Sequence, residues 1–165
     1  MVIRDLLCSA IPDDAQLVNF EIIKPVNVEF FWSHEQTKNN VKFLSELIFM
    51  LYKYKSKITI LPHFISDGGS LRRINWTFTS DPYSTRCLIG FLLHDALYST
   101  EYFTRDECDW ILLELLQELG VGWFIRNKIW MGVRAGGWLE AWSKHTEKTI
   151  ADARTLVLKE DIENA

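Results

Sequence analysis

The sequence has few cysteines and no long apolar run. Its three cysteines, Cys8, Cys87 and Cys108, stand at no spacing typical of a metal site. The chain also lacks a cationic start followed by the apolar segment of a secretory signal. We therefore expect reduced, mostly buried thiols in a cytoplasmic setting. No stretch reaches the roughly 20 uncharged apolar residues of a membrane-spanning helix, so the sequence predicts a soluble protein without a transmembrane segment.

A surplus of basic residues is absent as well. The chain has 18 lysines and arginines against 22 aspartates and glutamates, a formal net charge of −4. Domains that bind nucleic acid, or that are held on anionic membranes by charge, usually carry a basic surplus, so the overall charge argues against both partners. It does not exclude a local cationic patch. A glycine-rich phosphate loop, a serine nucleophile elbow and a zinc-binding cysteine cluster are also missing.

The chain does contain enough apolar residues to form one hydrophobic core. With 165 residues and 48% hydrophobic content, one compact domain is the expected unit. We divide the chain into an N-terminal extension of unclear role (1–40), a core domain (41–143) and a C-terminal amphipathic helix or tail (144–165).

The first half of the chain is predicted to form β-structure. Residues 47–52 and 58–61 are apolar and flank the polar run 53–57, a pattern typical of a β-hairpin. The N-terminal extension should hold one or two extended segments, broken at Pro12 and Pro25.

The second half is predicted to be helical. A first helix should run from about 84 to 99, and a second should open at the capping box 104–107 and close at Gly120. Because only a handful of residues connect them, they should pack as antiparallel neighbours. We expect a third helix from about 123 to 142.

The charged C-terminal tail can form a fourth, amphipathic helix with Ile150, Ala153 and Val157 on one face. The predicted fold class is therefore α+β, in which a small antiparallel sheet or hairpin is followed by a packed helical hairpin and one or two further helices.

Polar side chains interrupt the apolar first helix, in the segment G-F-L-L-H-D-A-L-Y. At about 100° per residue, His94, Asp95 and Tyr98 share one arc of this helix. Asp109 falls at the edge of the apolar stripe of the second helix, and antiparallel packing would bring it roughly level with His94. The sequence thus predicts a carboxylate that faces an imidazole between the two helices.

Two interpretations of this cluster stay open. In the first, Asp109 fixes the tautomer of His94, which then takes a proton from water. Asp95 is left to bind a hard cation such as calcium, together with Asp67 in the loop D-G-G-S. In the second, His94, Tyr98 and Asp109 form a satisfied buried network that only fixes how the helices pack. A catalytic cluster should face a water-accessible cleft, and an architectural one should be sealed.

The polar cluster is one of several motifs that follow one another over roughly residues 47 to 142. They read I-T-I-L-P-H-F-I-S-D-G-G-S-L-R-R-I-N-W, then L-L-H-D-A-L-Y, then T-R-D-E-C-D-W-I-L-L-E-L-L-Q-E-L-G-V. Together they resemble a phage- and prophage-borne family catalogued as domain of unknown function 1353. The chain departs from that family's pattern at His63, Gly69 and Arg72. The resemblance implies a phage-encoded accessory or virion-associated protein, located in the virion or the host cytoplasm, with other phage proteins as partners.

A second, local resemblance concerns chemistry. The segments H-D-A-L-Y and D-E-C-D-W are similar to the catalytic helices of phospholipases A2, which share H-D-x-x-Y and a later Asp on an antiparallel helix. This resemblance implies that His94 is a general base, that Asp95 binds calcium, and that Tyr98 and Asp109 orient His94. The substrate would be a lipid ester. The disulfide lattice and the Gly-Cys-rich calcium loop of the secreted enzymes are missing.

Two alternatives complete the set of functions. A metal-dependent phosphohydrolase of the HD type would use His63 with His94 and Asp95, but His63 precedes the helices, so we rank this interpretation lower. The other alternative is a non-catalytic structural or adaptor component of the phage particle, in the tail or the head-tail region.

Tryptophans recur in the third predicted helix. Trp123, Trp130, Trp138 and Trp142 fall within about a third of the helix circumference. We favour an aromatic core packed on the first two helices. The alternative is an interfacial stripe that seats the domain on lipid or on a neighbouring virion subunit, with Arg134 on the same side.

Overall fold

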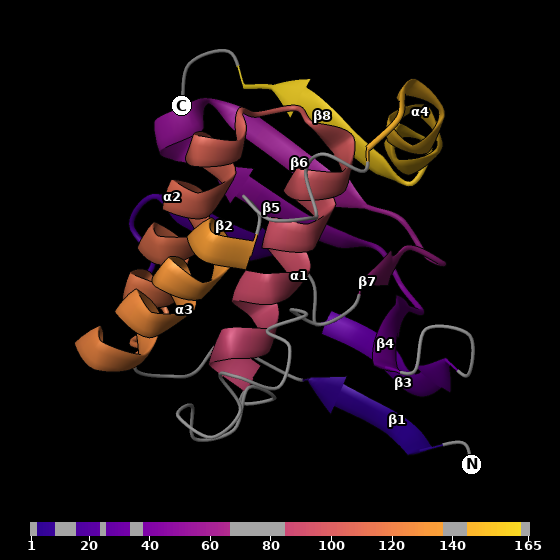
Figure 1. The fold of residues 1–165 in the computed structure, drawn as a ribbon, viewed down its shortest axis with the longest axis horizontal. Helices are drawn as coiled ribbons and strands as arrows, with labels where there is room; N and C mark the ends of the chain where they lie inside the picture. The colour runs from indigo at the N-terminus through magenta and orange to yellow at the C-terminus, as the bar shows by residue number, and fades with distance from the viewer. Residues whose placement is uncertain are drawn as a thin grey trace.

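The computed structural model describes residues 3–8, 16–23, 26–33, 38–66, 85–136 and 145–162. In these ranges, strands precede helices along most of the chain, which confirms the predicted α+β class (Figure 1). The elements are β1 (Ile3–Cys8), β2 (Phe20–Ile23), β3 (Val26–Ser33), β4 (Lys38–Phe43), β5 (Leu47–Leu51), a 3-10 turn (Tyr52–Tyr54), β6 (Ser56–Ile60), β7 (Ile65–Ser66), α1 (Thr85–Thr100), α2 (Arg105–Glu118), α3 (Trp123–Gly136), α4 (Glu147–Arg154) and β8 (Val157–Asp161).

The strands form two antiparallel four-stranded sheets within the described residues. One has the order β1-β3-β4-β7 and the other β2-β5-β6-β8. The predicted hairpin is confirmed as β5–β6, in which Leu51 pairs with Ser56. Lys55 closes the turn in the left-handed conformation, at φ 47°. Both predicted breaks, Pro12 and Pro25, lie outside the described residues.

The C-terminal segment departs from its prediction. A helix does form, but it ends at Arg154, and Val157 begins a strand that pairs with β6. The spacing of Ile150, Ala153 and Val157 suggested one continuous helical face. Val157 is instead fully buried in the core, and its carbonyl accepts a hydrogen bond from the Tyr102 hydroxyl at 3.0 Å. Burial of a β-branched side chain against the sheet outweighs the local helical pattern.

The helical hairpin of α1 and α2 agrees with its prediction. The Thr104 side chain accepts from the Glu107 backbone N–H, and Glu107 accepts from the Thr104 N–H, as in a capping box. Gly120 follows α2 with φ 76°, a conformation that glycine adopts without strain. The two helices are antiparallel, and the start of α1 lies beside the end of α2. There, Arg86 donates a hydrogen bond to the Leu119 carbonyl at 2.9 Å.

Close approach of the two helices depends on Gly90. A Cβ built on Gly90 would lie 2.8 Å from Leu116 Cδ2, so only a residue without a side chain lets α2 come this near. The main core lies between the hairpin and the sheets. A smaller cluster joins α1, α2 and α3, and its buried residues are Cys87, Phe91, Leu112, Leu116, Val121 and Ile129.

The third predicted helix is observed from Trp123 to Gly136, and residues 137–144 lie outside the described ranges. Among the described helices, none has the length and apolar character needed to cross a membrane. Cys87 and Cys108 are buried thiols, in agreement with the prediction.

Candidate functional site

The centre of the site is a pair of side chains that face each other across the hairpin. His94 Nε2 lies 3.0 Å from Asp109 Oδ1. His94 is 7% exposed and Asp109 is fully buried. The predicted meeting of imidazole and carboxylate is therefore observed. It follows from the short connection between the helices, which places a residue near the end of α1 level with one near the start of α2.

The other ring nitrogen of His94 is turned toward Asp95. His94 Nδ1 lies 4.0 Å from Asp95 Oδ1, and the Asp95 side chain is 21% exposed. The Ser66 hydroxyl donates a hydrogen bond to Asp95 Oδ2. Ser66 reaches this point because β7 pairs with β4, where it stands opposite Val41. Both imidazole nitrogens are thus near a carboxylate, one buried and one at the edge of the solvent.

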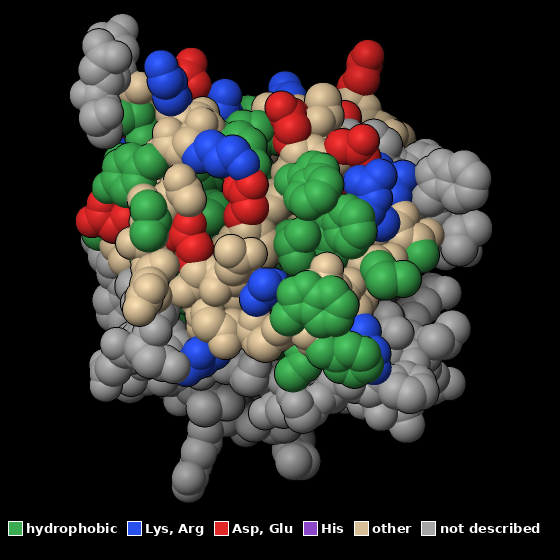
Figure 2. Space-filling model, turned by 90° about the vertical axis from the view of Figure 1, so that its left-hand side faces the viewer, with side chains coloured by type: hydrophobic (Ala, Val, Ile, Leu, Met, Phe, Trp, Pro, Cys, Tyr) green, Lys and Arg blue, Asp and Glu red, His purple; other side chains and the backbone are tan. Residues whose placement is uncertain are grey.

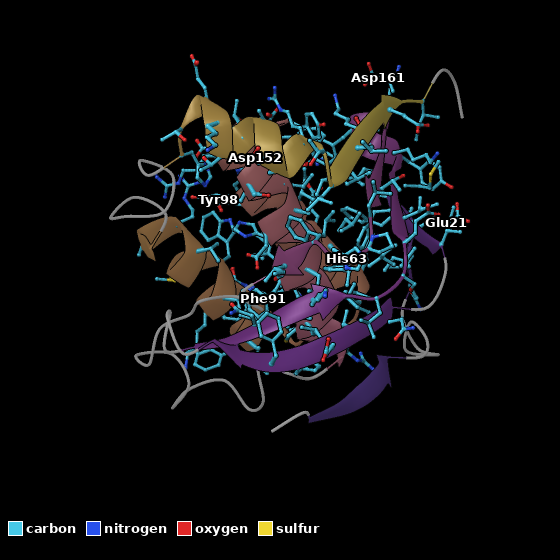
Figure 3. The ribbon with its side chains drawn as sticks, turned by 90° about the vertical axis from the view of Figure 1, so that its right-hand side faces the viewer. Glu21, His63, Phe91, Tyr98, Asp152 and Asp161 are labelled. Atoms are coloured by element: carbon cyan, nitrogen blue, oxygen red, sulfur yellow. The ribbon has the colours of Figure 1, made fainter. Side chains whose placement is uncertain are left out.

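Tyr98 covers one face of the imidazole. The two rings stack with centroids 4.9 Å apart and an interplanar angle of 29°. Burial raises the pKa of the Tyr98 phenol, and the nearby Arg105 opposes this effect only in part. On its other side, Tyr98 meets the ring of His145 edge-on, at 6.1 Å between centroids. Tyr98 therefore acts as a neutral aromatic wall beside His94. Figure 3 labels its position on α1.

A cation from α3 completes the charge arrangement. Arg134 Nη1 lies 3.9 Å from Asp109 Oδ2 and donates to Asp106 Oδ1 at 3.0 Å. Arg105 donates to the backbone carbonyl of Arg134 and so holds the end of α3. Asp109 Oδ2 makes no hydrogen bond within the described part of the chain, so Arg134 supplies the positive charge beside it. Arg134 could not be connected with Asp109 from the sequence, because nothing local indicates which turn of α3 meets α2.

These charges decide how His94 ionises. Burial lowers the pKa of His94, but the hydrogen bond to Asp109 and the negative charges of Asp95 and Asp109 together outweigh it, so the pKa is raised above its usual value. A raised pKa makes the imidazole a stronger base. Cys108, beside Asp109, is not a competing nucleophile, because burial raises the pKa of its thiol and keeps it protonated.

The predicted cation site is only partly described. Asp95 and Ser66 offer hard oxygen atoms, which calcium prefers, but calcium takes 6–8 such ligands. Within the described ranges, no group of three or more His, Cys, Asp or Glu side chains is placed to hold a metal. Asp67 and its glycines lie outside those ranges. The described side chains have the right chemistry but are too few to form the site alone.

His63 stands apart from this cluster. It is exposed in the turn between β6 and β7, at φ 75°, and it lies away from Tyr98 in Figure 3. The described residues therefore do not assemble the ligand set that an HD-type phosphohydrolase would need.

The tryptophans of α3 do not all pack in an aromatic core, although the favoured interpretation predicts that they do. Trp123 is 68% exposed, so the prediction that it packs in the core is wrong. Trp130 is half-buried and packs against Trp110 of α2, with ring centroids 5.1 Å apart and the ring planes tilted by 43°. Trp138 and Trp142 lie outside the described residues.

Comparison with known proteins places part of the chain in a described family. Residues 44–133 match the family described as "Protein of unknown function (DUF1353)". The matched segment contains the whole α1–α2 hairpin and most of α3, so it includes His94, Asp95 and Asp109. No curated protein and no solved structure matches the chain.

Proposed function

This chain belongs to the family of proteins of unknown function DUF1353, and from its own side chains we propose that it hydrolyses a lipid ester with His94 as the general base. The observation that carries the proposal is the position of His94 between two carboxylates. Asp109 holds Nε2 at 3.0 Å, and Nδ1 is turned toward the partly exposed Asp95.

The proposed reaction uses the dyad as follows. Asp109 accepts the Nε2–H of His94, which leaves the lone pair on Nδ1. His94 Nδ1 takes a proton from a water molecule as the water oxygen bonds to the ester carbonyl carbon. The tetrahedral intermediate then loses the alcohol oxygen, which receives the proton back from His94. The products are a fatty acid and an alcohol, and Asp109 stabilises the imidazolium formed between the two steps.

A cation is part of the proposal. Asp95, together with Asp67, would hold calcium, which would polarise the ester carbonyl when bound.

We also propose a phage context for the protein, as an accessory or virion-associated component in the virion or the host cytoplasm. The support is the motif resemblance to phage- and prophage-borne sequences. Mass spectrometry of purified particles tests it. Peptides of this chain in washed particles are expected, and their absence from particles whose other minor proteins are detected would restrict the protein to the host cytoplasm.

A second function is favoured by a different observation, the burial of the His94 and Asp109 side chains. Asp109 is fully buried and His94 is 7% exposed, as expected of a network that fixes helix packing. In that case the protein is a non-catalytic structural or adaptor component, and the His94–Asp109 contact specifies only the fold.

Fatty-acid release decides between the two. We would measure it on dispersed short-chain phospholipids of several headgroup classes, with calcium and with a chelator. For the enzyme, His94→Asn should lower turnover by about 10²–10⁴-fold while the far-ultraviolet circular dichroism is unchanged. His63→Asn is the matched control, because His63 is exposed in the turn between β6 and β7 and stands apart from the dyad. The absence of turnover by folded wild-type protein on every class would overturn the hydrolase and leave the architectural function.

A further inference from the structure

A large apolar surface lies on the outside of α3. Trp123, Phe124 and Met131 are 68%, 61% and 64% exposed, and Trp110 of the neighbouring α2 is 47% exposed. We call the surface formed by Trp110, Trp123, Phe124, Trp130 and Met131 the α3 aromatic face. Figure 2 shows hydrophobic side chains gathered on this side of the molecule, with both Lys or Arg and Asp or Glu side chains around them. Exposed apolar patches of this kind usually mark a binding surface.

Three members of this face, Trp123, Phe124 and Met131, are exposed and are not needed for packing α3 onto the domain. That packing is made by Ile125, Ile129 and Val133, which repeat every four residues in or against the smaller core cluster, and by Trp130 against Trp110 of α2. The exposed aromatic side chains are therefore additional to the fold.

The charges of α3 set it apart from the rest of the chain. It carries Arg126, Lys128 and Arg134 and neither aspartate nor glutamate, in a protein of net charge −4. Two of these cations lie against aromatic rings. Lys128 Nζ is 4.0 Å from the centre of the Phe124 ring, and the Arg134 guanidinium is 5.3 Å from that of Trp130. Aromatic and cationic groups are thus interleaved on one helix.

We propose that the α3 aromatic face docks on the surface of an anionic phospholipid bilayer. Tryptophan and phenylalanine side chains enter the boundary between headgroups and acyl chains, and lysine and arginine beside them meet the lipid phosphates. An acidic protein can do this because the attraction depends on charges within about a Debye length of the surface. On α3 these charges are Arg126 and Lys128, since Arg134 is paired with Asp106 at 3.0 Å.

A second copy of the chain fits this face less well. In a two-fold dimer the same patch meets itself, so the cations of one α3 would approach those of the other. The proposal also stands without the hydrolase, because a chain that binds bilayers and cleaves nothing would still satisfy it.

Vesicle sedimentation tests the proposal with the full chain carrying His94→Asn, so that hydrolysis cannot alter the membrane. The vesicles contain phosphatidylcholine alone or phosphatidylcholine with phosphatidylglycerol. We expect binding to the anionic vesicles, reduced about tenfold or more by Trp123→Ala with Phe124→Ala. Lys128→Glu should weaken binding to anionic vesicles selectively.

The matched control is Val18→Ala with Leu158→Ala, since Val18 and Leu158 are exposed apolar residues, at 75% and 39%, on other elements. This control should bind as the parent does. Absence of binding to anionic vesicles would overturn the proposal, and so would equal losses in the control and the aromatic variant. A dimer in sedimentation velocity that Trp123→Ala with Phe124→Ala dissolves, without vesicle binding, would assign the face to a second copy instead. Hydrolysis is measured separately on dispersed substrate, so either proposal can fail alone.

Discussion

His94 on α1 and Asp109 on α2 are joined by a 3.0 Å contact between Nε2 and Oδ1, inside a hairpin whose other buried side chains are mostly apolar. The carboxylate is fully buried and has Arg134 on its other side, with 3.9 Å between Oδ2 and Nη1. An imidazole, a carboxylate and a guanidinium thus lie in sequence from α1 through α2 to α3. The packing of α1, α2 and α3 at this point therefore depends on the negative charge of one buried carboxylate, that of Asp109.

Replacing Asp109 by asparagine should therefore be costly, whichever function the cluster has. Asp109→Asn removes the negative charge between His94 and Arg134, so His94 Nε2 loses a charged acceptor and the Arg134 guanidinium loses its buried counter-charge. We expect a loss of about 2–4 kcal/mol in the free energy of unfolding. Asp106→Asn is the matched control on the same helix. Asp106 is 70% exposed in its side chain and should lose less than about 1 kcal/mol. Urea denaturation measures the unfolding free energies of both variants. Equal losses would contradict the claim that the buried charge of Asp109 stabilises the fold more than the exposed charge of Asp106.

The stability of the protein should depend on pH through His94. Its folded-state pKa is raised above 6.5, so the protonated form binds its neighbours better in the folded chain. This contribution is fully present below pH 6.5 and is lost as the pH rises through the folded pKa. The charged groups that face His94 are Asp95 and Asp109, with Arg134 behind Asp109.

Urea denaturation of wild type and His94→Gln across neutral pH measures this contribution. The difference between the two unfolding free energies should shrink as the pH increases. A difference that grows with pH would show that burial, which lowers the pKa of His94, outweighs the two carboxylates.

The hairpin could be predicted from sequence because its signals are local. Thr104 and Glu107 stand three residues apart in a capping box, and Gly120 terminates α2, so both ends of the helix are specified within a few residues. The meeting of His94 with Asp109 then follows from the length of the connection.

Contacts between segments far apart in the sequence could not be predicted this way. Ser66 reaches Asp95 only through the pairing of β7 with β4, and Arg134 reaches Asp109 only through the packing angle of α3. Val157 was assigned to a helix because its spacing from Ile150 fits a helical face, and its pairing with β6 depends on a strand about a hundred residues earlier.

Gly90→Ala should destabilise the hairpin, although alanine is the better helix former. The new Cβ would lie 2.8 Å from Leu116 Cδ2 and 3.1 Å from Leu112 Cδ1, both in the buried interface. Overpacking costs about 1–3 kcal/mol, against about 1 kcal/mol gained in helix propensity. We expect a net loss of up to about 2 kcal/mol in thermal or urea unfolding. Gly122→Ala, where a Cβ meets nothing within 4 Å, is the control and should change stability by less than about 1 kcal/mol. A stabilised Gly90→Ala variant would mean that the two leucines move aside freely.

Glu118 ties the N-terminal segment to the end of α2, and its charge should matter more than its size. Its carboxylate accepts hydrogen bonds from the Val18 backbone N–H at 2.8 Å and from the Asn19 side-chain amide at 2.7 Å. Every partner is a donor, so Glu118→Gln turns an amide NH₂ toward at least one of them and loses the charge-assisted bonds. We expect the unfolding free energy to fall by about 1–3 kcal/mol, with faster amide hydrogen exchange at Val18 and Asn19 than in wild type. Gln117→Glu, one position earlier and exposed, is the matched control for the same pair of residue types. If exchange at Val18 and Asn19 is unchanged in Glu118→Gln, the segment is held by β2 pairing with β5 and not by this carboxylate.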